Sequence, residues 1–166
     1  MKIAFDTSAL VEINKNKPYK QSQIAALQEL LKLKHDGLPH KFVYLDAVRR
    51  EIAGSTFDRI AREVEIADFM SVFDETISLS RFPIIMPVII VGPEHGRIQD
   101  YFANQVAVSR KDSAILADVI YAKCDHFVTT DDKLLNNNQA VRGALDSYGM
   151  VILDPIQMLS QVQVEA

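Results

Sequence analysis

Four carboxylates stand at positions where the sequence makes an acidic side chain chemically useful. Asp6 follows the apolar run 2–5, and Asp131 follows the largely apolar run 126–130. Both runs are predicted to be buried strands, and the carboxyl ends of strands in open parallel sheets form the edge where ligands bind. We therefore expect Asp6 and Asp131 to face a common ligand site at that edge.

Helical periodicity brings two more acids to the inside of the protein. At about 100° per residue, Asp112 shares a stripe with Ile115 and Val119, and Glu51 shares one with Val48. Apolar stripes of this kind face the sheet, so both carboxylates are predicted to point inward. An inward-facing carboxylate is unfavourable unless another group compensates its charge.

The four acids together favour a metal site. If their side chains converge, the carboxylates repel one another and partly protonate, and a divalent cation removes that conflict. Ligation by oxygen alone suits hard ions such as Mg²⁺ or Mn²⁺. Held at an acidic site, these ions activate water and stabilise the charge that develops during phosphodiester hydrolysis. The chemistry expected of the site is therefore hydrolysis without an organic cofactor.

Each acid also has a purely structural explanation. The acids that follow the two strands can cap the next helix, and so can Asp132. Ser109 and Asp112 have nearly the spacing and chemistry of a capping box. Glu51 would be a solvated helix acid if the helical phase shifted by one residue. Taken singly, the acids leave these structural explanations open.

Other polar residues receive no part in the predicted site. The helical count turns Asp118 away from the inward stripe, and it turns Arg49 and Arg50 outward. The single cysteine, Cys124, excludes an internal disulfide and a zinc site of several cysteines. Histidines without metal-ligand spacing are assigned no role; they are His35, His40, His95 and His126.

Apolar runs alternate with amphipathic segments along the chain. Strands are predicted at 2–5, 42–45, 69–73, 126–130 and 150–153. Helices are predicted at 7–11, 21–34, 47–53, 57–67, 95–106, 111–123 and 137–146, with a short one after Pro155. The proline-rich segment 76–94 is predicted to be a buried strand or an extended loop. Because the strand runs lack in–out alternation, we expect an α/β protein, a three-layer α/β/α sandwich around a mainly parallel sheet.

Length, charge and hydropathy limit the class of protein. The 166 residues suit one compact domain, to which we assign residues 1–160, with a C-terminal tail over 161–166. The net charge of −4 argues against a protein that coats nucleic acid by charge alone, but metal ions and local basic patches keep a nuclease open. No signal peptide or bilayer-spanning run is evident, so we expect a soluble, cytoplasmic protein.

Four segments resemble, in order, the motifs of PIN domains. Residues 6–10 follow the first strand, residues 48–52 contain the second acid, and residues 112–117 open a helix with an aspartate. Residues 124–135 form the most specific segment, a strand that ends in Thr-x-Asp. The resemblance covers the chain from residue 3 to about residue 153.

The resemblance implies an activity and a site. PIN domains are typically Mg²⁺- or Mn²⁺-dependent ribonucleases, and many are toxins of bacterial type II toxin–antitoxin pairs. It implies a metal-dependent endoribonuclease with RNA as its substrate and an antitoxin or a second copy as candidate partner. The implied metal ligands are Asp6, Glu51, Asp112 and Asp131, supported by Ser8, Thr129 and Thr130, with Asp132 as a weaker candidate. The segment 76–105 is longer than in the compact toxins of the family.

Two other functions stay open beside a ribonuclease. A PIN fold without catalysis would be an RNA-binding or protein-interaction module, and an unrelated metal phosphohydrolase would act on small phosphate esters. Arg110 and Lys111 flank Asp112 and are the best-placed candidates for contact with RNA phosphate, although a solvated helix face is the favoured explanation of both residues. Three outcomes distinguish these functions. A ribonuclease cleaves RNA, an inactive module binds RNA without cleaving it, and a phosphohydrolase hydrolyses small esters but not RNA.

Overall fold

Among the described residues, six parallel strands form one sheet at the centre of the protein. The computed structural model describes residues 1–13, 18–53, 66–78, 88–90, 92–136 and 139–165 of the chain. The strands are β1 (Lys2–Phe5), β2 (Lys41–Tyr44), β3 (Glu75–Ser78), β4 (Val88–Ile90), β5 (His126–Val128) and β6 (Val151–Leu153). Their order across the sheet is β4-β3-β2-β1-β5-β6. The predicted parallel sheet is therefore confirmed.

The central strand β1 is buried and pairs in parallel with a strand on each side. Ile3 and Ala4 are fully buried and Phe5 almost so, because helices cover both faces of the sheet. β1 pairs with β2 on one side and β5 on the other, and Phe5 is in register with Val128. This register brings the carboxyl ends of β1 and β5 to the same edge, where Asp6 and Thr129 follow.

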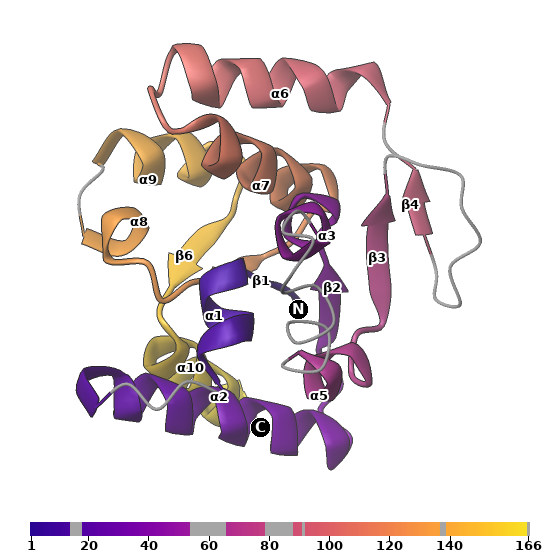
Figure 1. Cartoon of the computed structure of the whole chain (residues 1–166), viewed down its shortest axis with the longest axis vertical. Helices are drawn as coiled ribbons and strands as arrows, with labels where there is room; N and C mark the ends of the chain where they lie inside the picture. Colours follow the sequence, from indigo (N-terminus) through magenta and orange to yellow (C-terminus); the bar gives the residue numbers. More distant parts are fainter. Residues whose placement is uncertain (14–17, 54–65, 79–87, 91, 137–138, 166) are drawn as a thin grey trace.

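The helices form two layers around the sheet (Figure 1). On one side lie α2 (Gln21–His35), α5 (Ala67–Met70) and α10 (Pro155–Glu165). On the other side lie α3 (Asp46–Ala53), α6 (Pro93–Asn104), α7 (Arg110–Tyr121) and α9 (Gln139–Asp146). Three short elements follow strands or link helices: α1 (Thr7–Glu12), η1 (Pro18–Lys20) and α8 (Asp132–Asn136). The three-layer α/β/α arrangement predicted from the sequence is confirmed.

One predicted strand is wrong. Residues 69–73 were expected to form a strand, but Phe69 lies in α5 and the strand β3 begins at Glu75. Phe69 and Phe73 are four residues apart and both face the core, with their ring centroids 6.2 Å apart and Phe69 5.2 Å from Phe5. A spacing of four brings side chains together on a helical turn, whereas in a strand the same two rings would lie much farther apart.

Three further predictions meet the structure differently. The helix predicted over 57–67 lies almost wholly outside the described residues. Within the segment 76–94, predicted to be a buried strand or an extended loop, residues 79–87 also lie outside them. The described parts of that segment contain most of the strand β3 and the strand β4. The expected tail from residue 161 is wrong, because α10 continues to Glu165 and buries Val162 in the core. The short helix α8 was not predicted.

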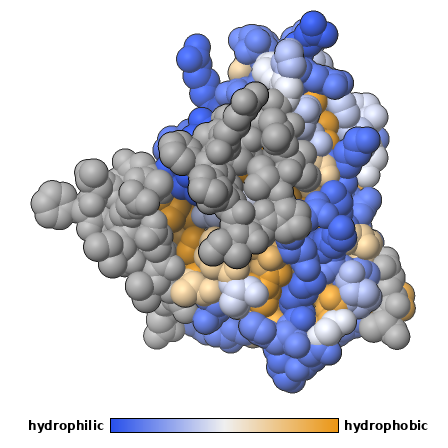
Figure 2. All heavy atoms as spheres, turned by 90° about the vertical axis from the view of Figure 1, so that its right-hand side faces the viewer, coloured by the Kyte–Doolittle hydropathy of each residue, from blue (hydrophilic) through white to orange (hydrophobic). Residues whose placement is uncertain are grey.

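The described residues on one face of the protein are mostly polar at the surface. On the face that Figure 2 shows, hydrophilic residues cover most of the described surface and hydrophobic residues are visible only in limited areas. Among the described residues, no helix is both long and apolar enough to cross a bilayer.

Candidate active site

The buried carboxylate of Asp6 is the centre of the candidate site. Asp6 is the first residue after β1, and its backbone N–H donates to the carbonyl of Val128 at 2.8 Å. Only 6% of its surface is exposed. The hydroxyls of Ser8 and Thr129 each donate to Asp6 Oδ2 at 2.7 Å. Two segments that are far apart in the chain therefore hold the same carboxylate oxygen.

A second carboxylate acts on Asp6. Burial raises the pKa of Asp6 above its ordinary value, while the hydrogen bonds from Thr129 and Ser8 oppose that rise. The negative charge of Glu51 raises the pKa of Asp6 further. A buried acid beside a like charge is costly to ionise, and a cation placed between the two would remove the cost.

Glu51 reaches this region from α3. Its side chain is half-buried, and the Thr7 hydroxyl donates to Glu51 Oε2 at 2.6 Å. Lys111 Nζ lies 3.8 Å from Glu51 Oε1, but the Lys111 side chain is 80% exposed, so this ion pair is weak. α3 packs against α7 and against α1, the helix that follows Asp6.

Asp131 is joined to Asp6 through Thr129. The Asp131 N–H donates to Thr129 Oγ1 at 3.0 Å, and that same hydroxyl donates to Asp6. Asp131 also starts α8, because its side chain accepts the N–H of Lys133 at 2.8 Å. Its carboxylate thus acts as a helix cap, which is one of the structural explanations that the sequence left open. Asp132, the weaker candidate, is exposed at the start of α8.

Thr130, which stands between Thr129 and Asp131 in the chain, is fully buried. Its N–H donates to Ser8 Oγ at 3.2 Å. Its own hydroxyl oxygen has no hydrogen-bond partner among the described residues. The hydroxyls of Ser8 and Thr129 therefore hold Asp6, and Thr130 supports Ser8 through its backbone N–H; these are the positions that the resemblance indicates for supporting residues.

Asp112 is hydrogen-bonded to Ser109 at the start of α7. The Ser109 hydroxyl donates to Asp112 Oδ2 at 2.6 Å, and the Asp112 N–H donates back to Ser109 Oγ at 3.1 Å. This is the capping pair that the spacing allowed. Arg110 and Lys111 beside it are exposed.

The structure brings some of the four acids together and not others. Asp6 and Glu51 interact electrostatically, and Asp131 is linked to Asp6 by one bridging hydroxyl. Asp112 contacts Ser109 instead. In the described part of the chain, no three or more acids, histidines or cysteines are arranged as a ready-made metal site. The four-carboxylate metal site therefore stays a prediction, and the Asp6–Glu51 pair is where the residues present fit a cation best.

Asp118 and His95 form a buried polar pair that the sequence analysis missed. Asp118 was predicted to point away from the inward stripe, but it is fully buried, and His95 is 4% exposed. Asp118 Oδ1 lies 2.6 Å from His95 Nε2, and Asp118 Oδ2 accepts the N–H of Ala47 at 2.7 Å. One carboxylate thereby joins α7, α6 and α3. The prediction failed because α6 and α3 cover the outer side of α7, whose residues 113–120 are all buried.

Asp46 has a related role at the start of α3. It is fully buried, and it pairs with Arg49 at 2.6 Å and with Arg50 at 2.8 Å. Both arginines therefore turn back to the start of their own helix, although their ends remain partly exposed. This pairing reduces the positive charge that they can offer to a ligand.

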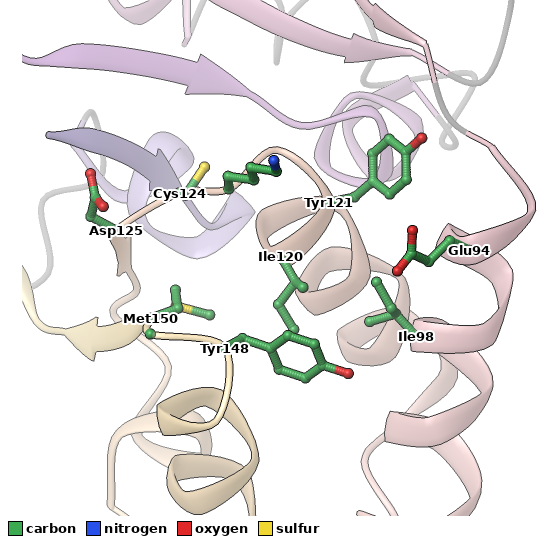
Figure 3. Close-up of a pocket in the computed structure, with 10 residues that line it drawn as sticks. Glu94, Ile98, Ile120, Tyr121, Cys124, Asp125, Tyr148 and Met150 are labelled. Carbon is green, nitrogen blue, oxygen red and sulfur yellow. The ribbon is translucent and has the colours of Figure 1, made fainter.

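A pocket of about 670 Å³ lies at the opposite edge of the sheet. Of the residues that line it, Cys124 and Asp125 precede β5, and Met150 precedes β6. Figure 3 shows Tyr148 and Ile120 facing the pocket together with Glu94 and Ile98 of α6. Asp125 accepts the N–H of Lys2 at 2.7 Å. Burial raises the pKa of the Cys124 thiol to about 12, so the thiol stays protonated and unreactive at neutral pH. The acids at the other edge remain the better candidates for catalysis.

Comparison with known proteins supports the fold. No protein-family model matches the chain, and no curated protein matches it. The chain is similar in structure to a chain in the crystal structure of VapBC2 from Rickettsia felis, which was solved bound to a DNA fragment from the VapBC2 promoter. The TM-score is 0.54 and the sequence identity is 13%. The match covers 93% of this chain and 98% of that one. At this level of identity the likeness shows the fold alone, which is the α/β/α arrangement around a parallel sheet described above.

Proposed function

We propose that this protein is a divalent-metal-dependent endoribonuclease. The observation that carries the proposal is the buried Asp6 carboxylate at the carboxyl end of the central strand, with the charge of Glu51 acting on it. A fold that only needed a helix cap at this position would gain nothing from a second acid nearby. The PIN-like fold and the order of the four acidic motifs support the same activity.

The proposed metal ligands are Asp6, Glu51, Asp112 and Asp131, with Mg²⁺ or Mn²⁺ as the ion. When bound, the ion supplies positive charge that neutralises the acids and polarises a phosphodiester. Asp112 would exchange its hydrogen bond with Ser109 for the metal. Since an exposed hydrogen bond contributes only about 1 kcal/mol, that exchange is small beside the binding of a divalent ion.

The chain's own residues have separate roles in this proposal. Ser8 and Thr129 hold Asp6 by its Oδ2 and favour the ionised form, which is the form that binds a cation. Thr7 donates a hydrogen bond to Glu51 Oε2 and so holds that carboxylate in place. The half-buried Asp131 and Asp112 would complete the acidic site from β5 and α7. RNA hydrolysis then requires water to attack phosphorus as the bond to the leaving ribose oxygen breaks.

A protein partner belongs to the same proposal. The similar structure is a VapBC2 assembly on promoter DNA, and many PIN proteins are toxins held by an antitoxin. We therefore include an antitoxin-like partner, and a homodimer, among the interactions to be tested. A neighbouring gene for a small DNA-binding protein would support the assignment as a toxin.

The test is a cleavage assay on a mixed panel of single-stranded and structured RNAs with Mg²⁺ or Mn²⁺. We expect cleavage by the wild type, loss of cleavage with a chelator, and a loss of more than about 100-fold in Asp6→Asn and Asp112→Asn, because even outer partners of metal ligands cost 10- to 100-fold. Asp100→Asn, an exposed acid on α6, is the matched control and should remain active. Full activity of both site variants would rule out this mechanism.

A second function is favoured by one specific observation. Asp112 is bonded to the cap residue Ser109 and Asp131 caps α8, so both carboxylates have a structural role, as in a non-catalytic RNA-binding or protein-interaction module. Binding of RNA with no cleavage under any metal condition would establish that alternative. Hydrolysis of small phosphate esters without any cleavage of RNA would instead indicate a phosphohydrolase.

A further inference from the structure

The buried carboxylate of Asp118 caps the start of a neighbouring helix. Its Oδ2 accepts the N–H of Ala47, the second residue of α3, at 2.7 Å and across 71 positions of the chain. The first N–H groups of a helix have no partner within the helix, and a carboxylate beside them also meets the positive end of the helix dipole. Asp118 is fully buried, so this bond is shielded from water. The start of α3 is therefore linked directly to α7.

His95 is bonded to the other oxygen of the same carboxylate. Its Nε2 lies 2.6 Å from Asp118 Oδ1, and both side chains are buried. His95 belongs to the first turn of α6, where the N–H of Gly92 donates to the Tyr121 hydroxyl at 2.9 Å and the His95 and Tyr121 rings meet edge to face. Since both of its oxygens are engaged, the Asp118 carboxylate cannot rotate without breaking a buried hydrogen bond.

Glu51 lies one helical turn beyond this link. Ala47 and Glu51 are four residues apart on α3, so they share one side of the helix, about 6 Å apart along its axis. The Glu51 carboxylate is also held by the hydroxyl of Thr7, the residue that follows Asp6, at 2.6 Å. Thr7 thus holds the side chain of Glu51, while Asp118 holds the helix that carries it.

We propose that Asp118 and His95 are positioning residues that fix Glu51 relative to Asp6 and so determine the affinity of the acids for a divalent cation. This inference rests on the proposed function, because it takes a cation as the ligand of Asp6 and Glu51. The pair contacts neither the cation nor RNA and acts only through the placement of α3. Metal ligands bind tightly when outer hydrogen bonds hold them in place beforehand.

The first measurement is the Kd for Mn²⁺ alone, by isothermal titration calorimetry well below the unfolding midpoint, so that every variant is folded. Asp118→Ala should raise this Kd about 10- to 100-fold, the range for outer partners of metal ligands. Asp118→Asn should keep a Kd close to that of the wild type, because its amide oxygen still accepts from Ala47 and its amide N–H can donate to a neutral His95 ring. His95→Ala should raise the Kd by a smaller factor than Asp118→Ala, since the bond to Ala47 remains.

The matched control is a variant that loses stability elsewhere. Met158 is fully buried on α10, in the other helix layer, and Met158→Ala should lower the unfolding midpoint through the cavity that it leaves. Its Kd for Mn²⁺ should equal that of the wild type. An equal rise in Kd in Met158→Ala and Asp118→Ala would show that lost stability alone weakens metal binding, and it would overturn the proposal.

A double-mutant cycle tests whether Asp118 acts through Glu51. If it does, Asp118→Ala should change the Kd for Mn²⁺ little in a Glu51→Gln background, because the ligand that it positions is already impaired. The effects of the two substitutions on the Kd are then strongly non-additive. Full additivity would mean that Asp118 acts by another route, and the proposal would fail.

The two proposals can fail separately. If the variants change the Kd for Mn²⁺ as expected but the wild type cleaves no RNA, the ribonuclease proposal fails and the positioning role of Asp118 stands. If the wild type cleaves RNA with Mn²⁺ while Asp118→Ala keeps the wild-type Kd, the positioning role fails and the ribonuclease proposal stands. A wild type that binds no Mn²⁺ overturns both.

Discussion

The hydroxyl of Thr129 donates a hydrogen bond of 2.7 Å to Asp6, a residue 123 positions earlier in the chain. The bond exists because β1 and β5 are parallel neighbours, so the residues that follow them lie at one edge of the sheet. Thr129 Oγ1 also accepts the N–H of Asp131, and one hydroxyl therefore sets the positions of two of the candidate acids.

Replacing Thr129 by valine tests this relationship. Thr129→Val keeps the shape of the side chain but removes a hydrogen bond that lowers the pKa of Asp6, so we expect that pKa to rise further. The free energy of unfolding at neutral pH should fall by about 1.5–3 kcal/mol, the range for hydrogen bonds to charged groups. Urea denaturation measures the loss. A stability equal to that of the wild type would show that the bond contributes nothing.

Asp6 should make the metal-free protein less stable as pH rises. Its pKa is raised above 3.8 in the folded state, so the folded protein binds more protons than the unfolded chain between 3.8 and that raised value. The contribution of Asp6 to stability is then fully present below pH 3.8 and is lost as pH rises through the folded pKa. We expect Asp6→Asn to gain stability relative to the wild type over this window. Paired urea titrations at several pH values, with a chelator present, measure the difference.

Divalent metal should reverse that effect. A cation at Asp6 and Glu51 binds only the folded state, so Mn²⁺ at about 100 times its Kd should stabilise the wild type by about 2.7 kcal/mol. Asp6→Asn and Glu51→Gln should lose most of this gain. The measurement is the thermal midpoint with Mn²⁺ against the midpoint with chelator, and Asp100→Asn serves as the control. Equal shifts in all four proteins would place the metal elsewhere.

The Asp118–His95 pair should be essential for stability. Asp118→Ala leaves the His95 ring and the Ala47 N–H without their buried partner, and we expect the free energy of unfolding to fall by about 3–5 kcal/mol. The exposed Asp68→Ala on α5 should change it by less than about 0.5 kcal/mol. Circular dichroism during urea unfolding compares the two. A small loss in Asp118→Ala would mean that water replaces the missing carboxylate.

Ser109→Ala separates the two roles of Asp112. The substitution removes the cap of α7 and should destabilise the protein by about 1 kcal/mol. It also releases the carboxylate of Asp112, so the concentration of Mn²⁺ needed for half-maximal RNA cleavage should decrease. An unchanged metal requirement would indicate that Asp112 does not leave Ser109 to bind metal.

Much of the framework could be predicted from local sequence patterns. The strand Lys2–Phe5 was predicted with its observed bounds, and the helix Gln21–His35 within one residue. Apolar runs without alternation predicted a sheet covered on both faces, which in turn placed Asp6 and Asp131 at one edge. These predictions succeeded because they depend on hydrophobic periodicity, which is a property of the chain itself.

Other features were decided by the tertiary structure. The periodicity of α7 indicates which of its residues share a face, but it does not indicate how many other helices pack against it. Both α6 and α3 pack on α7, and they bury Asp118. Phe69 was predicted to lie in a strand, yet it packs on Phe5 from the helix α5. The links Thr129–Asp6 and Lys20–Thr130 join residues more than a hundred positions apart. The sequence by itself thus determined which acids follow which elements, and only the folded sheet decided which of them meet, because hydrogen bonds and charge interactions depend on distances that packing sets.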